Sequence, residues 1–387
     1  MELYVAGGCS EHGRNSFLVT SKKVTFLVDA GKMKEIPDKP FPELSRKQIA
    51  KIDYLFLTHC HTDHTGALLL LYEKGFQGRV VASRATLQNI PGEIENAIVL
   101  EDLCPAGEET ELCTDFRVTW GRSGHCIGSV WYRFGIGKKT ILFTGDYEEH
   151  SYAYKCDKIR NLSADLAVLD CAYGTEKEDA LVHRKELEEL LDRLVQEEKP
   201  MLFPVPSHGR GFDVMKLLAE RGVTCVLAES LVREYQDSDK REFWLKKSFL
   251  EAMAEMNTED IRDFEAAFRK TLGRGNSFPR KYIRCGILVR DSQLVKEQNR
   301  EVARGVAAKG GRTVLTGKQD PASFARKILD EGKADFRRIS VHQNISEMKK
   351  LIRKNDFQCV VPYHCREQLS FSEKKIKVLR TGDRIHF

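Results

Sequence analysis

This chain has no long apolar run, no low-complexity tract and no short-period repeat in its 387 residues. Because a membrane-spanning helix needs about 18 or more apolar residues, no membrane span is expected. The lack of biased or repeated segments argues against disordered tails and solenoids. The hydrophobic content of 41% and the charged content of 31% are typical of soluble globular proteins. The length suits two or three domains, or one domain with a large insertion.

The first residues also lack a basic segment followed by an apolar one, which is the pattern of an export signal. They read as a first strand, so we expect a cytoplasmic protein. The eleven cysteines include no C-x-x-C pair, which argues against a disulfide framework and for reduced thiols. The sequence leaves the oligomeric state open, a homo-oligomer included.

Acidic residues are scarce in one stretch, residues 268–312, which we call the basic sector. It holds twelve Lys or Arg residues against three Asp or Glu, although the net charge of the whole chain is only +5. This excess indicates either an anionic partner or a solvated helical face. The aromatic residues Phe268, Phe278 and Tyr282 within it are expected either to stack on nucleic-acid bases or to belong to a hydrophobic core.

The densest group of polar residues is His59-Cys60-His61-Thr62-Asp63-His64, directly after the apolar run at residues 54–57. Imidazole and carboxylate groups together suit zinc and related cations. Burying these four groups without a cation would be costly. A polar surface loop is the alternative, but turns favour Gly, Asn, Asp and Ser over histidine. The motif therefore predicts a metal site for two ions.

Short strands separated by glycine-bearing turns are predicted before residue 170. Near residue 175 the pattern changes to longer amphipathic helices with strands between them. Helices are predicted around residues 212–221 and 241–272. Short strands return late in the chain. We therefore expect an α/β protein in which a smaller α/β unit is inserted into the first domain.

Four other segments also place a polar side chain at the end of an apolar run. These side chains are Asp29, His125, Asp146 and His364. Singly, each has an ordinary explanation, because Asp before Gly forms turns and a lone histidine is usually structural. The motif offers four metal ligands, and the last three of these residues offer three more. The total matches the roughly seven ligands that a two-metal site needs.

The series Asp29, His-x-His-x-Asp-His, His125 and Asp146 resembles the metallo-β-lactamase fold. Segments 124–129, 143–147 and 169–175 are similar to the β-CASP branch of that family, which includes the cleavage and polyadenylation endonuclease and ribonuclease J. The resemblance implies an αββα sandwich with an inserted smaller α/β cap, the β-CASP domain. It places the first part of the sandwich at residues 1–175, the cap at 176–335 and the return segment at 336–387.

The resemblance also implies a metal-binding role for seven residues, with zinc as the metal and manganese or iron as alternatives. The first zinc ion would bind His59, His61 and His125. The second would bind Asp63, His64 and His364. Asp146 would bridge the two ions.

The catalytic roles implied by the resemblance fall to Asp63, His342 and Asp170. A hydroxide held between the ions would attack phosphorus, while His342, oriented by Asp170, would donate a proton to the leaving oxygen. Asp29 would fix a ligand or loop by hydrogen bonds. Arg210 would either bind substrate or cap a helix.

These features together predict a zinc-dependent hydrolase that cleaves phosphodiester bonds, with RNA as the first substrate and single-stranded DNA as the second. Loop 315–321, Leu-Thr-Gly-Lys-Gln-Asp-Pro, departs from the family because it has one glycine where backbone amides would hold phosphate. Two alternatives therefore stay open. One is a hydrolase of small esters, thioesters or phosphodiesters that uses the same site. The other is a non-catalytic member that binds RNA or a protein.

Overall fold

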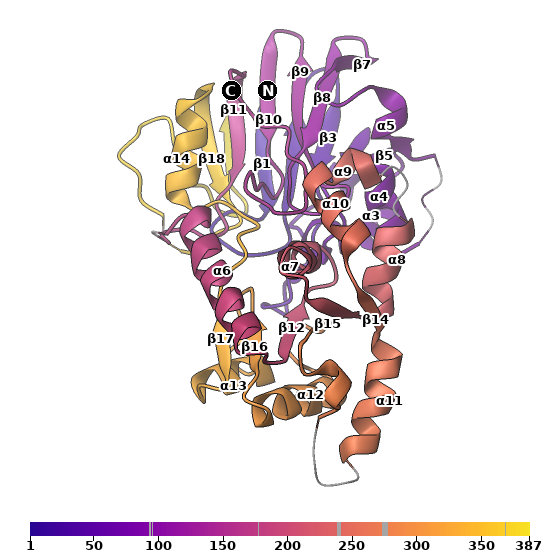
Figure 1. Cartoon of the computed structure of the whole chain (residues 1–387). Helices are drawn as coiled ribbons and strands as arrows, with labels where there is room; N and C mark the ends of the chain where they lie inside the picture. Colours follow the sequence, from indigo (N-terminus) through magenta and orange to yellow (C-terminus); the bar gives the residue numbers. More distant parts are fainter. Residues whose placement is uncertain (93, 95, 177, 238–240, 273–277, 368) are drawn as a thin grey trace. The chain divides into compact units, whose positions relative to one another are not determined.

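The computed structural model describes residues 1–387 except 93, 95, 177, 238–240, 273–277 and 368. The chain forms two compact units (Figure 1). The first contains Met1–Glu149, Cys156–Asp179 and His342–Phe387, and the second contains His150–Lys155 and Ala180–Val341. The chain thus leaves the first unit twice, and the first departure, at residues 150–155, has no counterpart in the domain limits expected from the sequence.

The described residues of the first unit form two sheets and six short helices. The first sheet has the strand order β19 (Arg384–His386), β1 (Glu2–Gly7), β2 (Ser16–Thr20), β3 (Thr25–Val28), β4 (Tyr54–Phe56), β5 (Arg79–Ala82) and β6 (Ile98–Val99). The second has the order β18 (Asp356–Tyr363), β11 (Ser163–Asp170), β10 (Lys139–Phe143), β9 (Val130–Ile136), β8 (Phe116–Arg122) and β7 (Glu109–Cys113). The helices are α1 (Arg46–Ile49), α2 (Thr62–Thr65), α3 (Leu68–Glu73), α4 (Arg84–Asn89), α5 (Leu100–Leu103) and α14 (Ile345–Arg353).

Aromatic side chains fill the space between these two sheets. The rings of Phe26 and Phe56, in the first sheet, lie with their centroids 4.6 Å from that of Phe134 in the second. On its outer face the first sheet packs against α3 through Leu68, and the second packs against α14 through Leu351. The four layers are helix, sheet, sheet and helix, so the predicted αββα sandwich is confirmed.

Strand β18 lies beside β11 although the second unit separates them in the sequence. Figure 1 shows β18 and α14, both yellow, next to β11. Strands β10, β11 and β18 run parallel, as do β3, β4 and β5 in the first sheet. Because parallel strands end at the same edge of a sheet, the residues that follow them are brought together there.

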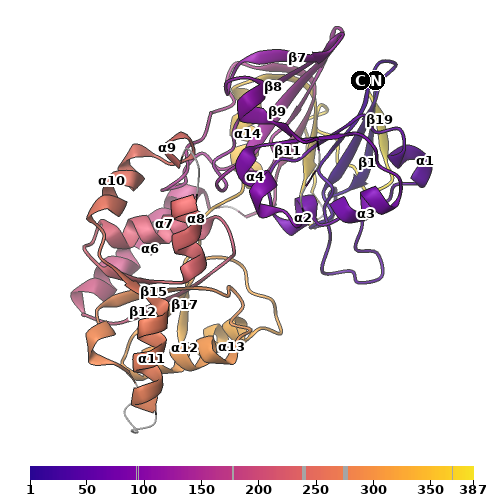
Figure 2. The same ribbon diagram turned by 90° about the vertical axis from the view of Figure 1, so that its right-hand side faces the viewer.

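The second unit is built on one parallel sheet. Its strand order is β14 (Thr258–Asp260), β13 (Thr224–Leu227), β15 (Cys285–Arg290), β12 (Met201–Val205), β16 (Arg312–Leu315) and β17 (Ala334–Phe336). Its helices are α6 (Ala180–Gln196), α7 (Arg210–Ala219), α8 (Glu229–Asp237), α9 (Arg241–Trp244), α10 (Lys247–Glu255), α11 (Ile261–Leu272), α12 (Glu297–Ala308), α13 (Phe324–Asp330) and the 3-10 helix η1 (Arg280–Tyr282). Figure 2 shows helices on both faces of this sheet, as parallel sheets require.

The helical region predicted around residues 241–272 is interrupted by a strand. Three helices and a strand, α9, α10, β14 and α11, occupy this region. The carbonyl of Asn257 accepts a hydrogen bond from the backbone N–H of Cys225 at 2.9 Å, and the next residues pair with β13 as an edge strand. This pairing with a distant strand overrides the local helical periodicity.

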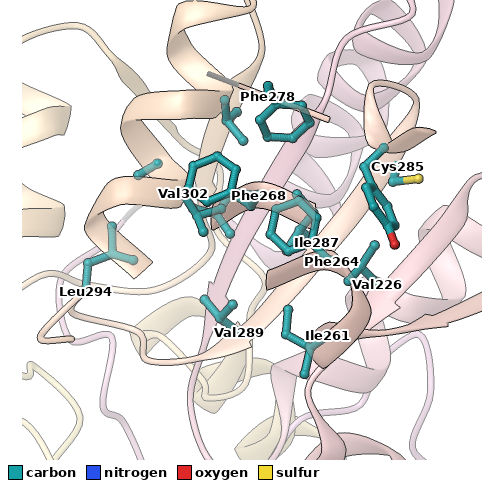
Figure 3. Packing of buried hydrophobic residues seen from close by; sticks show 14 of the residues in the cluster. Val226, Ile261, Phe264, Phe268, Phe278, Cys285, Ile287, Val289, Leu294 and Val302 are labelled. Carbon is teal, nitrogen blue, oxygen red and sulfur yellow. The ribbon is translucent and has the colours of Figure 1, made fainter. Parts of the chain in front are cut away.

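The aromatic residues of the basic sector belong to the hydrophobic core of the second unit. Phe268, Phe278 and Tyr282 are only 3%, 4% and 2% exposed, and Figure 3 shows Phe268 and Phe278 packed among aliphatic side chains. Of the two interpretations, the core is therefore correct, and these rings are not available to stack on bases. Residues 273–277 of the sector lie outside the described residues.

Most of the basic sector's charge is also balanced locally. Among the described residues of the sector, seven cations form ion pairs with acidic residues of the second unit: Arg269, Lys281, Arg284, Arg290, Arg300, Arg304 and Arg312. Exposed pairs of this kind add little stability, but they reduce the net positive field of the sector. The solvated-face interpretation fits these contacts better than a continuous cationic surface.

Asp213 on α7 fastens residues 150–155 to the second unit. Its Oδ1 accepts hydrogen bonds from the Ser151 hydroxyl at 2.8 Å and from the backbone N–H groups of Tyr152 and Ala153 at 2.6 and 3.1 Å. Burial raises the pKa of this carboxyl, although the three donors act to lower it. The side chain is therefore a buried acceptor shared by three donors.

Replacing Asp213 with alanine is expected to destabilise the second unit by about 3 kcal/mol, because three buried donors lose their partner. The variant Asp213→Asn keeps a carbonyl oxygen in place, so its loss is expected to be about 1 kcal/mol. Urea unfolding followed by circular dichroism measures both values. Equal stability of the two variants would show that the shared oxygen is not what fastens this segment.

Among the described residues, no helix combines the length and the apolar character needed to cross a membrane.

Candidate metal centre

The polar residues singled out in the sequence gather at one edge of the first unit. They follow strand ends: Asp29 after β3, the His59–His64 motif after β4, Asp146 after β10 and His364 after β18. His125 lies in the turn between β8 and β9, Asp170 is the last residue of β11, and His342 lies just before α14. Chain topology therefore assembles the site from segments more than 300 residues apart.

One group of potential ligands consists of His59, His61, His125 and Asp146. The Nδ1 atom of His61 lies 3.0 Å from Nε2 of His59 and 3.1 Å from Nε2 of His125. The Oδ2 atom of Asp146 lies 3.4 and 3.5 Å from the same two Nε2 atoms. Three ring nitrogens and one carboxylate oxygen thus converge on one point, as in a four-coordinate metal site.

A second group consists of Asp63, His64 and His364, and Asp146 joins it to the first. The Oδ2 atom of Asp63 lies 3.1 Å from Nε2 of His364 and 3.7 Å from Nε2 of His64. The Oδ1 atom of Asp146 lies 3.2 Å from Nδ1 of His364 and 3.3 Å from Nε2 of His64. One carboxylate therefore presents a different oxygen to each group, which is the geometry of a bridging ligand.

The buried atoms of His364 test whether these residues fit a cation. Its side chain is 1% exposed, yet neither ring nitrogen forms a hydrogen bond in the described structure. Both nitrogens lie close to carboxylate oxygens, but not in hydrogen-bond geometry. Buried nitrogens are rarely left without a partner. A divalent cation bound by one of these nitrogens, together with the neighbouring imidazole and carboxylate groups, would supply the missing partner.

Charges within the site act strongly on one another. Burial acts to raise the pKa of Asp146, but the imidazoles of His64 and His364 hold it well below its usual range. Conversely, burial acts to lower the pKa of His364, but Asp146 and Asp63 raise it to about 10. Burial keeps the pKa of His59 and that of His125 below the usual value. These two rings are therefore neutral, which is the form that binds metal.

Asp29 contacts both His64 of the motif and the residue that precedes the motif. Its Oδ2 lies 2.7 Å from Nδ1 of His64, and its Oδ1 accepts a hydrogen bond from the backbone N–H of Thr58 at 2.8 Å. Gly31 packs against the motif and has no room for a side chain, because a Cβ there would lie 1.7 Å from the carbonyl oxygen of Asp63. Asp29 thus fixes the ring of His64 with a carboxylate, as is usual for metal-binding histidines.

His342 and Asp170 form a pair beside the two groups. The Nδ1 atom of His342 lies 3.1 Å from Oδ2 of Asp170 and 3.7 Å from Oδ2 of Asp146. Backbone N–H groups of Tyr147 and Ala172 donate to Asp170 at 3.1 and 3.0 Å, which fixes its carboxylate. His342 also falls within a third potential ligand group with Asp146, Asp170 and His364. Two roles therefore fit it, proton transfer and metal binding.

Arg210 belongs to the second unit, where it begins α7. Its Nε donates a hydrogen bond to the carbonyl of Ile339 at 3.1 Å, and a Cβ on Gly317 would lie 2.6 Å from its Nη1. The structure thus places Arg210 against the loop 315–321, which the sequence singled out separately. Its role in substrate binding stays a prediction.

Four residues near the site were missed by the sequence analysis. Asn15 Nδ2 lies 2.9 Å from Nε2 of His64, the Thr58 hydroxyl donates to Asp29 at 2.8 Å, and the Tyr363 hydroxyl donates to Asp146 Oδ1 at 3.2 Å. The ring of His12 lies beside that of His364. The polar run from Glu11 to Asn15 was an available signal, because it follows β1 as Asp29 follows β3.

Comparison with known proteins agrees with this architecture. The family model for the metallo-beta-lactamase superfamily matches residues 10–195. A crystal structure of a protein of unknown function from Enterococcus faecalis V583 has a TM-score of 0.62 and 13% identity, with 99% of each chain covered. At this identity the likeness shows a shared fold alone.

Two relatives have a higher sequence identity to this chain. Endoribonuclease YSH1 of Candida glabrata is 25% identical over 246 residues, which cover 55% of this chain and 32% of that protein. Transcription termination factor FttA of Methanothermobacter thermautotrophicus is 25% identical over 297 residues, which cover 67% of this chain and 45% of that protein. The chain spans less than half the length of these relatives. The match to the metallo-beta-lactamase superfamily over residues 10–195 and the converging His and Asp side chains together indicate a divalent-metal site in this chain.

Proposed function

We propose that the protein is a two-metal hydrolase that cleaves phosphodiester bonds in RNA. The observation that carries the proposal is the shared carboxylate of Asp146, which contacts both groups of histidines and lies beside the His342–Asp170 pair. The names of the endoribonuclease relatives support RNA as the substrate class. Zinc is the proposed metal because imidazole and carboxylate ligands suit it, and manganese or iron would suit the same donors.

The proposed ligands divide between two cations. His59, His61 and His125 would hold one, Asp63, His64 and His364 the other, and Asp146 would contact both. Bound divalent ions lower the pKa of water to near neutral and stabilise negative charge on a phosphoryl group. Asp29 keeps the ring of His64 in place through its contact with Nδ1 at 2.7 Å, which leaves Nε2 to face the cation.

His342 is the proposed proton donor to the leaving oxygen. With Nδ1 next to Asp170, a proton carried on Nε2 would be the one transferred. The anchored carboxylate of Asp170 would hold the ring in the tautomer and orientation that this transfer requires. The His342 side chain is 12% exposed, so a substrate can reach it.

A small-molecule hydrolase is the second candidate, and one observation favours it. The basic sector offers less free charge than the sequence implied, because seven of its cations are ion-paired and its three aromatic residues are buried. A polymer would have to be held by other groups, whereas a small ester or thioester would need only the metal centre. A non-catalytic role is the third candidate.

Removing the metal is expected to abolish cleavage of end-labelled single-stranded RNA, and adding zinc or manganese is expected to restore it. Protein treated with a chelator and then dialysed is compared with metal-loaded protein, and metal content is measured by mass spectrometry. In parallel, both samples are given bis(p-nitrophenyl) phosphate, a thioester and a lactone. Metal-loaded protein that hydrolyses one of these but leaves RNA intact would establish the small-molecule candidate instead. Loaded protein inactive on every substrate would favour the non-catalytic one.

A further inference from the structure

The loop between β1 and β2 contacts the second ligand group at several points. The Gly8 carbonyl accepts a hydrogen bond from the backbone N–H of His364 at 2.7 Å, and Asn15 Nδ2 lies 2.9 Å from His64 Nε2. The ring centroid of His12 lies 4.4 Å from that of His364. The loop therefore supports the histidines of one group, and His12 is its aromatic member.

Among the described residues, the ring of His12 lies close to that of His364. The rings of His342, His64 and Tyr363 lie farther away, at 5.1, 5.6 and 5.7 Å. The planes of His12 and His364 are tilted by 33°, and the two rings are in close contact. Such offset contact between rings adds to the energy of burial alone.

His364 has particular need of such support. Its backbone lies in the left-handed region, with φ of 68°, a conformation uncommon for residues other than glycine. The ring of His64 is fixed by Asp29 and that of His342 by Asp170. In contrast, both nitrogens of His364 face the carboxylates of the site, so no outer hydrogen bond is left to fix its ring.

The loop is itself held firmly on both sides of His12. Glu11 Oε1 accepts hydrogen bonds from the Gly8 backbone, the Arg14 guanidinium and the Thr381 hydroxyl at 2.9, 2.8 and 2.9 Å. Arg14 is buried and also donates to the Phe41 carbonyl at 3.2 Å. The backbone around His12 is therefore held in place by hydrogen bonds of Glu11 and Arg14.

We propose that His12 is a positioning residue of the metal centre, whose ring holds His364 in the orientation in which it binds a cation. The inference rests on the metal-binding part of the proposed function, and not on the identity of the substrate. His12 itself belongs to none of the potential ligand groups found among the described residues. It therefore acts through His364.

The test is a titration of metal-free protein with Co²⁺, followed by the visible absorption of the bound ion and by calorimetry. Two binding steps are expected in the unsubstituted protein. In His12→Ala, the affinity of one step is expected to fall by about 10–100-fold, as when the outer support of a metal-binding histidine is removed. The other step, at His59, His61 and His125, is expected to stay unchanged.

Two further variants separate stacking from other effects. His12→Phe keeps a ring over His364 and is expected to retain the affinity of both steps. His386→Ala, at a side chain that is 79% exposed on β19, serves as the matched control. Circular dichroism and thermal unfolding show whether each variant is folded.

Several outcomes would overturn the proposal. Unchanged affinity of both steps in folded His12→Ala would do so, as would a His12→Phe variant as weak as His12→Ala. A protein that binds one cation only, at His59, His61 and His125, would also overturn it, because His364 would then bind no cation. If neither the unsubstituted protein nor its variants cleave RNA, but the affinity of one metal-binding step still falls in His12→Ala, this inference stands and only the nuclease assignment fails.

Discussion

Asp146→Ala is expected to lose all RNA cleavage and at least one of its two bound metals. The alanine removes both oxygens of the carboxylate that lies 3.2–3.5 Å from four imidazoles. Each proposed cation loses a ligand, and the site loses the negative charge that all four rings face. The drop should exceed the about 10²–10⁴-fold contribution of a single proton donor.

Metal content and RNA cleavage are measured on the same preparations, so that loss of activity can be traced to loss of metal. Asp146→Asn keeps the shape of the side chain without its charge and shows whether the charge itself is required. Asp102→Ala removes a carboxylate whose side chain is 58% exposed and is the matched control. An Asp146→Ala protein that still holds two metals and cleaves at the original rate would refute the bridging role.

His342→Ala is expected to lower RNA cleavage by about 10²–10⁴-fold, the usual contribution of a proton donor. Its metal content should stay at two equivalents, since the proposed ligands are all retained. The loss should be small for bis(p-nitrophenyl) phosphate, because its leaving group departs readily without a proton. The measurement is the ratio of kcat for the two substrates, compared between the variant and the unsubstituted protein.

Metal content decides between the two roles that fit His342. If His342→Ala loses a metal, then the group formed with Asp170 and His364 is a binding site, and proton donation must be reassigned. Asp170→Asn should show the same preference for the activated substrate in weaker form, because the ring remains but its orientation is less well fixed. Equal losses on both substrates, with metal retained, would rule out proton donation.

Much of the site could be predicted because its residues follow strands. The His59–His64 motif comes after a recognisable apolar run, and Asp146 and His364 come after others. Parallel strands place such residues at one edge whatever lies between them in the sequence. The sequence could therefore indicate which residues meet, without indicating how closely.

The loop residues could not be predicted in the same way. Asn15 and His12 reach the site because residues at opposite ends of the chain meet, as in the hydrogen bond between the Gly8 carbonyl and the backbone of His364. No local pattern carries that information. The same limit applies at residues 241–272, where pairing of β14 with β13 interrupts a helical pattern.

The basic sector shows a different limit. A count of charges cannot show which cations are already paired, and Glu198 and Asp335, partners of Arg284 and Arg312, lie outside the sector. Likewise, Phe268 among charged neighbours looks exposed until α11 is seen to bury one face against the sheet. Composition therefore left open whether these aromatic rings lie at a surface or in a core, and the structure places them in a core.

The pairing of β18 with β11 across the insertion also has a consequence for synthesis on the ribosome. Asp146 and Asp170 emerge before the second unit is made, whereas His342 and His364 emerge only after it. A nascent chain, or one ended by a premature stop codon within the insertion, thus lacks a proposed metal ligand and the proposed proton donor. The order of these segments in the chain means that an incompletely synthesised protein lacks a complete active site.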